Sequence, residues 1–189
     1  MIGLTTMRPL LLTIAMALAT LLAACSTPTP PANWQKGGAT LDVPRARWVR
    51  GDSVIELARN GAVYVDGDHE LTVDRAGRVY EADGTPVALL QADGRLIGPD
   101  DEDLGVVGAA RASLPGRDAV AWLGLYPTGE LVIYGDEGQR LALGVWLGCN
   151  ESPRVAQTCV LISHLVAQQL RRRHQQPSVM FGVGVGVGF

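Results

Sequence analysis

This sequence offers three kinds of side chain that could carry out chemistry: histidines, cysteines and a run of acidic residues. A histidine that acts as an acid or a base needs a hydrogen-bond partner and a pocket. His69 lies between Asp68 and Glu70 in a predicted hairpin turn, where neither is expected. We therefore expect His69 to be a surface residue and keep it as a weak candidate site.

The C-terminal histidine and arginine residues belong to a predicted helix. His164 directly follows Ser163, and adjacent helix positions do not face each other, so the two cannot form a Ser–His dyad. His164 falls on the narrow polar strip of this helix, where we expect it to be solvated. Arg171, Arg172 and Arg173 could contact anionic lipid, or they could simply complement the negative C-terminus of the helix. All four are weak candidates.

Asp100, Asp101, Glu102 and Asp103 could supply oxygen ligands for calcium. Their order departs from an EF-hand loop, which alternates its ligands and closes with a glutamate. A charged surface loop is the favoured interpretation. The sequence has no nucleotide-binding, zinc-protease or serine-hydrolase motif. We therefore expect no metal, no cofactor and no catalytic residue, and leave open whether the protein is an enzyme.

The N-terminus has the layout of an export signal. Arg8 provides a positive charge and residues 9–22 are apolar apart from two threonines, a run too short to span a bilayer comfortably. The residues Leu22-Ala23-Ala24-Cys25 resemble the lipobox of bacterial lipoproteins. The resemblance implies that residues 1–24 are removed as a signal peptide and that Cys25 carries the lipid that anchors the protein. Because Ser26 stands where such proteins carry an aspartate for inner-membrane retention, the outer membrane is the expected location.

Once Cys25 is assigned to the lipid, Cys149 and Cys159 remain. An exported compartment is oxidising, so an even pair at short spacing predicts a disulfide. Their spacing is not C-x-x-C and no zinc-ligand set accompanies them; redox and metal roles are the alternatives. The formal net charge of −3 gives no reason to expect a nucleic-acid partner.

The rest of the chain predicts a mainly β, α+β fold. Residues 25–40 are rich in Pro, Thr and Gly and predict a tether. Residues 41–148 are short apolar runs separated by Asp-Gly and Asn-Gly turns, which are typical of an antiparallel meander in a sandwich, a roll or an open barrel. Expected strands include residues 53–57, 62–65, 70–73, 78–81, 86–90, 95–98 and, in a more apolar second block, 118–126, 130–134 and 140–148.

Residues 149–176 predict a disulfide-tethered amphipathic helix with Ser152 as N-cap and Pro153 at its first position. Its apolar stripe is wide, so we expect it to lie against a sheet. The alternating Val and Gly of residues 177–189 predict a terminal strand that belongs to the same domain; a free or membrane-contacting end is the alternative.

The mature chain resembles a group of uncharacterised exported lipoproteins in its DG-punctuated β repeats, in "VWLGC" followed by "TCVLISHL", and in its Gly/Val end. That resemblance implies no activity. The function expected is a non-catalytic binding or structural role in the cell envelope, with an envelope protein or polymer as partner besides the lipid bilayer. The alternatives are an envelope-polymer-processing enzyme and an oligomeric or membrane-contacting assembly component that uses its C-terminal strand.

Overall fold

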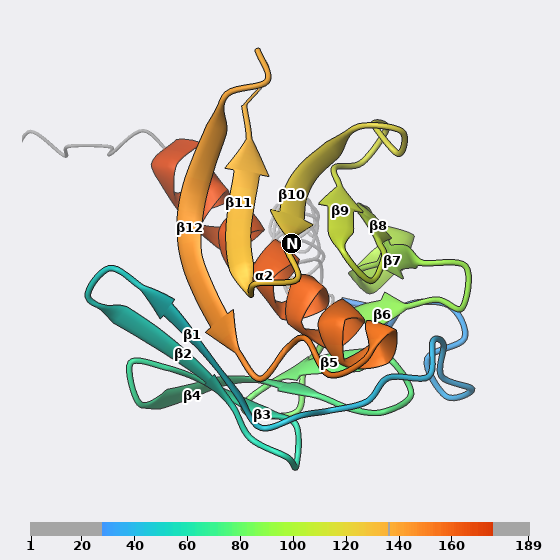
Figure 1. The fold of residues 1–189 in the computed structure, drawn as a ribbon. Coiled ribbons are helices and arrows are strands. Elements are labelled where there is room, and N and C mark those ends of the chain that lie inside the picture. The colour runs from blue at the N-terminus through green and yellow to red at the C-terminus, as the bar shows by residue number, and fades with distance from the viewer. Residues whose placement is uncertain (1–27, 136, 176–189) are drawn as a thin grey trace, which may run out of the picture.

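The computed structural model describes residues 28–135 and 137–175, with side chains up to Gln169. Twelve antiparallel strands form a closed barrel around one long helix (Figure 1). The strands are β1 (Ala46–Arg50), β2 (Ser53–Leu57), β3 (Ala62–Val65), β4 (Asp68–Val73), β5 (Arg78–Glu81), β6 (Pro86–Leu90), β7 (Arg95–Ile97), β8 (Asp103–Val107), β9 (Arg111–Ser113), β10 (Ala121–Leu125), β11 (Glu130–Tyr134) and β12 (Arg140–Leu147). The helix is α2 (Pro153–Gln175), and a short 3-10 helix, η1 (Pro99–Asp101), joins β7 to β8.

The meander is confirmed, because every strand pairs with the next one along the chain. The meander forms neither a sandwich, a roll nor an open barrel: β12 pairs with β1, in the register that sets Trp48 opposite Trp146, and this closes the sheet into a barrel. Residues 53–57, 62–65, 78–81, 86–90 and 130–134 are strands with the predicted bounds. The expectation missed β1, β8 and β9, since each is either short or carries charges within its apolar pattern.

The turns lie at the predicted positions, but they are not all of the same type. Among the Asp-Gly and Asn-Gly turns, both central residues have a positive φ angle only at Asp66-Gly67 (52° and 98°), as a type I′ turn requires. At Asp83-Gly84 and Asp93-Gly94 only the glycine has positive φ. There the aspartate Oδ1 accepts a hydrogen bond from the backbone N–H two residues on, at 2.9 and 3.0 Å respectively. These aspartates therefore stabilise the turn through their side chains.

The segment assigned to a tether is partly bound to the barrel. Arg78 donates hydrogen bonds to the carbonyl oxygens of Trp34 (2.6 Å) and Gln35 (2.9 Å), and the Trp34 ring packs edge-on against Tyr80. Pro31 and Ala39 are buried. The expectation of a tether through residue 40 is thus corrected, because strand side chains satisfy this backbone where water would otherwise do so.

Helix α2 runs through the interior of the barrel and not along one face of a sheet. In Figure 1 it lies between β10–β12 on one side and β3–β6 on the other. Every residue from 158 to 167 is buried, and ten residues at about 100° each turn through more than two full circles. This part of the helix is therefore covered on all sides, which corrects the solvated position that the sequence predicted for His164. Ser152 caps the helix as expected, since its Oγ accepts the Val155 N–H at 3.2 Å.

Cys149 and Cys159 form the predicted disulfide, with their Cα atoms 6.1 Å apart. The bond joins the end of β12 to the second turn of α2, so it fixes the point at which the chain turns back into the barrel. The predicted terminal strand at residues 177–189 lies outside the described residues.

Replacing both cysteines by alanine should lower the free energy of unfolding by about 3 kcal/mol, because the disulfide closes a short loop in the unfolded chain. Chemical denaturation of the double variant and of the oxidised and reduced wild type measures this change. The reduced wild type should lose stability to a similar extent. Equal stability of all three proteins would contradict the prediction.

Candidate ligand-binding site at the barrel mouth

One end of the barrel, called here the mouth, is formed by the connections after β1, β3, β5, β7, β9 and β11, because an up-and-down barrel alternates its turns between two ends. Helix α2 enters at the opposite end, the base, and its last turns reach the mouth. A cavity of about 590 Å³ opens there, within the size range of small-molecule sites. Its described lining is mostly apolar: Trp48, Leu114, Val120, Ala121, Trp122, Ile133, Tyr134, Leu143 and Ala167, with Gly135, Gly138, Arg50 and Arg117.

Two β-bulges help to build this wall. The pairing of β10 with β9 shifts between Ala121 and Leu123, so Trp122 is an extra residue on its strand. The pairing of β11 with β12 shifts in the same way opposite Leu143. A bulge interrupts the alternation of side chains between the two faces. As a result Trp122 lies on the inner side together with Leu123, and Leu143 lies inside with Trp146.

The tryptophans of the barrel interior are held by hydrogen bonds of their indole N–H groups. Trp48 donates to the Leu143 carbonyl at 2.9 Å, and Trp146 donates to Ser163 Oγ on α2 at 2.8 Å. The rings of Trp48 and Trp146 also stack, with centroids 5.7 Å apart. A buried indole N–H needs such a partner. Both Trp48 and Trp122 belong to the cavity lining; Trp48 is fully buried, and Trp122 is 8% exposed.

His164 is a buried structural residue and not the solvated one expected. Trp122 donates its indole N–H to His164 Nδ1 at 2.8 Å, so Nδ1 must be the acceptor. The neutral ring then carries its proton on Nε2, which donates to the Leu104 carbonyl at 2.7 Å. A second proton would occupy Nδ1 and break the bond to Trp122. Burial lowers the pKa of His164 from 6.5 to about 4. The hydrogen bond to the Leu104 carbonyl acts in the other direction and raises the pKa, but it has the smaller effect.

The charged groups in the described lining are both arginines, and they differ in position. Arg50 ends β1 two residues after Trp48, so the alternation of the strand places it on the inner side. Arg117 belongs to the exposed connection between β9 and β10. Both side chains therefore bring positive charge to the rim of an otherwise apolar cavity.

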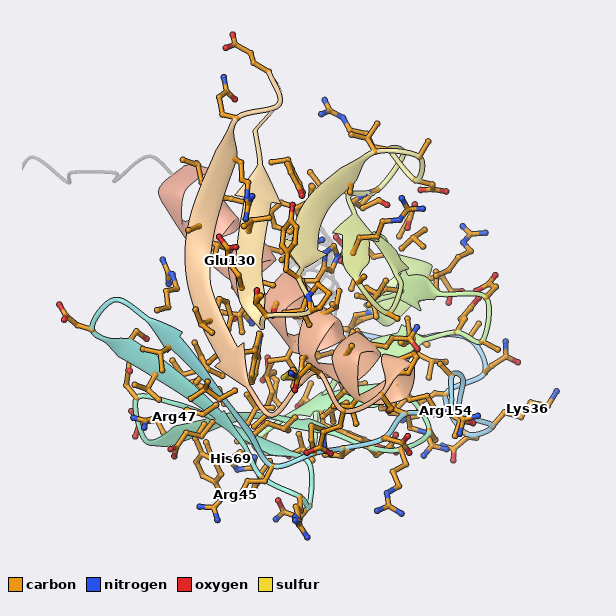
Figure 2. All side chains as sticks on the ribbon, viewed as in Figure 1. Lys36, Arg45, Arg47, His69, Glu130 and Arg154 are labelled. Carbon is orange, nitrogen blue, oxygen red and sulfur yellow. A yellow bond between two sulfur atoms is a disulfide. The ribbon has the colours of Figure 1, made fainter. Side chains whose placement is uncertain are left out.

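The other predicted site residues are dispersed. His69 lies in β4 and not at a turn tip; it is exposed on the outside of the barrel (Figure 2), where its Nε2 is 3.0 Å from both the Leu71 carbonyl and Thr72 Oγ1. Arg171, Arg172 and Arg173 are in the last turns of α2, and their side chains lie outside the described part, as does Cys25. Of these residues the structure describes only the side chain of His69, and it lies outside the cavity lining.

The acidic residues form backbone contacts in place of a calcium site. Asp100 and Asp101 have positive φ angles (54° and 59°) and bind the N-terminal segment through their side chains. Among the described residues, no group of three or more His, Cys, Asp or Glu side chains is arranged to hold a metal ion. Within the same residues, no helix combines the length and apolarity needed to cross a membrane.

Trp48, Ile133 and Leu143 could not be predicted as cavity residues from the sequence. Trp122 and Trp146 belong to the core, but no local signal marks Trp122 as lining a cavity. No protein-family model matches the chain, and no significant similarity to a curated protein or to a solved structure is found.

Replacing His164 by asparagine should remove a pH dependence of stability. The folded pKa of about 4 is depressed from 6.5, so between these values the unfolded chain binds a proton that the folded one does not. Wild-type stability should therefore fall by about 3 kcal/mol as the pH drops from 6.5 to 4. Asparagine retains an acceptor for Trp122 but does not titrate, so this part of the fall should disappear.

Urea denaturation across this pH range checks the prediction. His69→Asn is the matched control, since His69 is exposed and bonds only to neighbouring groups of its own strand. The control should retain the wild-type pH dependence. An unchanged pH dependence in His164→Asn would contradict the assignment.

Proposed function

We propose that this chain is a lipid-anchored protein of the bacterial cell envelope that binds an apolar small molecule at the mouth of its barrel and does not transform it. The single observation that carries the binding role is the cavity of about 590 Å³, lined by Trp48, Trp122 and aliphatic side chains. Cavities with an apolar lining and a few polar groups at the rim are the usual form of small-molecule sites.

The non-catalytic part of the proposal is supported by the surroundings of the two described candidate histidines. The hydrogen-bond partners of His164 and His69 are uncharged groups. An acid or base is instead activated by a charged or titrating neighbour, close to the reacting atoms. The envelope location and the anchor are supported by the resemblance of Leu22, Ala23, Ala24 and Cys25 to the lipobox of bacterial lipoproteins.

The anchor is tested by changing Cys25 to alanine. Without the thiol no acyl chain is attached, and the protein should move from the membrane fraction to the soluble fraction after export. Immunoblots of separated membrane and soluble fractions measure the distribution. Ser26→Ala is the matched control and should remain with the membranes. A variant at Cys25 that still fractionates with the membranes would overturn the anchor.

The binding role is tested with the dye N-phenyl-1-naphthylamine, which fluoresces in apolar surroundings. The full chain should bind the dye, and Ala167→Phe should weaken binding at least about tenfold, because the larger ring enters the cavity from α2 and removes apolar surface that the dye would cover. Ala92→Phe, at an exposed turn of the base, is the matched control.

The dye titration also has an outcome that contradicts the proposal. Equal dye binding by Ala167→Phe, Ala92→Phe and the wild type would show that the cavity is not the binding site. Circular dichroism of each variant establishes that it has folded. If Ala167→Phe does not fold, Ile133→Trp fills the same cavity from β11 and serves in its place.

A further inference from the structure

The path of the chain before β1 limits how far the barrel can lie from its anchor. The Thr29 backbone makes two hydrogen bonds with Asp100, through its N–H to Oδ1 (3.0 Å) and through its carbonyl to the Asp100 N–H (2.9 Å). Ala32 N–H donates to Asp101 Oδ1 at 2.8 Å. Cys25 precedes Thr29 by four residues, which span at most about 14 Å. The anchor therefore holds the barrel close to the bilayer.

The clamped segment is at the mouth end of the barrel. Asp100 and Asp101 belong to η1, which follows the end of β7 and precedes β8. The mouth contains this connection for the same topological reason that it contains the connections after β9 and β11. The Leu104 carbonyl at the start of β8 also contacts His164 and Gln168, in the half of α2 that approaches the cavity. The end that opens into the cavity is thus the end next to the anchor.

The rim of the mouth carries exposed apolar side chains. Val120 is 61% exposed and Leu141 is 56% exposed. Val120 lines the cavity, and Leu141 pairs with the cavity residue Ile133 across β11 and β12. Residues paired in this way project to the same side of the sheet. Apolar groups in this position would be removed from water by a lipid surface.

We propose that the mouth faces the bilayer and takes up from it the acyl chain of an anionic single-chain lipid. This inference rests on the proposed function. The apolar wall, including the rings of Trp48 and Trp122, surrounds the chain, while Arg50 at the rim binds the anionic head group. An arginine recognises a carboxylate through two parallel N–H donors.

The test uses the full lipidated chain in phosphatidylcholine vesicles that contain a small fraction of dibrominated stearic acid. Bromine quenches tryptophan fluorescence near contact, and Trp48 and Trp122 line the cavity. Dibrominated stearyl alcohol has the same chain without the charge. We expect the acid to bind about tenfold more tightly than the alcohol, because the guanidinium bonds to a charged acceptor.

Matched variants separate the head group from the chain. Arg50→Gln should bring the binding of the acid to within about twofold of that of the alcohol. Arg47→Gln is its control, since Arg47 projects to the outside of the same strand (Figure 2). Ala167→Phe should weaken the binding of acid and alcohol alike, because it fills the cavity.

A second variant tests the source of the lipid. Asp100→Gly with Asp101→Gly removes both clamping side chains, and glycine accepts their positive φ angles. Arg78 still holds the chain at Trp34. Once the one remaining backbone bond to the Thr29 carbonyl opens, the tether grows from four residues to nine. Uptake from the bilayer should slow about threefold, as the effective concentration falls with tether length. Binding of dibrominated undecanoic acid added from water should not change.

The outcomes distinguish this inference from the proposed function. If the dye binds but the acid and the alcohol bind equally, with no effect of Arg50→Gln, the lipid assignment is overturned and the cavity remains a binding site. If neither dye nor acid binds, both proposals fail. A third outcome uses phosphatidylcholine whose own acyl chains carry the bromines. If this lipid quenches tryptophan fluorescence as strongly as the free acid does, and Ala167→Phe does not change the quenching, the tryptophans are merely close to the bilayer and uptake is overturned.

Discussion

The constraint on which this fold depends is that a helix inside a barrel must have every polar group satisfied by the barrel wall. Residues 158–167 of α2 are buried on all sides, so Ser163 and His164 have no access to water. Each accepts an indole N–H, from Trp146 and Trp122 respectively, at 2.8 Å. An unpaired polar group in such a place would cost several kcal/mol. The tryptophans thus fix both the rotation of the helix and its depth in the barrel.

These bonds also account for the position of the cavity. Two bulges place Trp122 and Leu143 inside the barrel, where alternation alone would have turned them outward. Trp122 is held at His164, and among the helix side chains that the structure describes the cavity lining contains only the small Ala167. A small helix residue opposite two fixed walls leaves a space. The cavity is therefore a consequence of how the helix is held, and its apolar character follows from rings whose polar atoms are already bonded.

Internal hydrogen bonds also explain the roles of His164 and of the acidic residues Asp100 and Asp101. A histidine in a helix and a row of aspartates are the residues that would most readily suggest catalysis or calcium. In this protein His164 is a neutral link between an indole and a strand carbonyl. Asp100 and Asp101 hold the segment before β1 against the mouth. Both sets of residues position other parts of the structure.

The sequence by itself determined the local elements. Turn residues and alternation predict the bounds of five strands, β2, β3, β5, β6 and β11. The N-cap at Ser152 predicts the start of α2, and the pair of cysteines predicts the disulfide. Each of these signals depends on only a few neighbouring residues. The closure of the barrel was decided only by tertiary structure. It joins β1 to β12, about a hundred residues apart, and no local pattern encodes such a pairing. The burial of His164 and the cavity beside it depend on that closure, since the environment of a side chain is set by what encloses it.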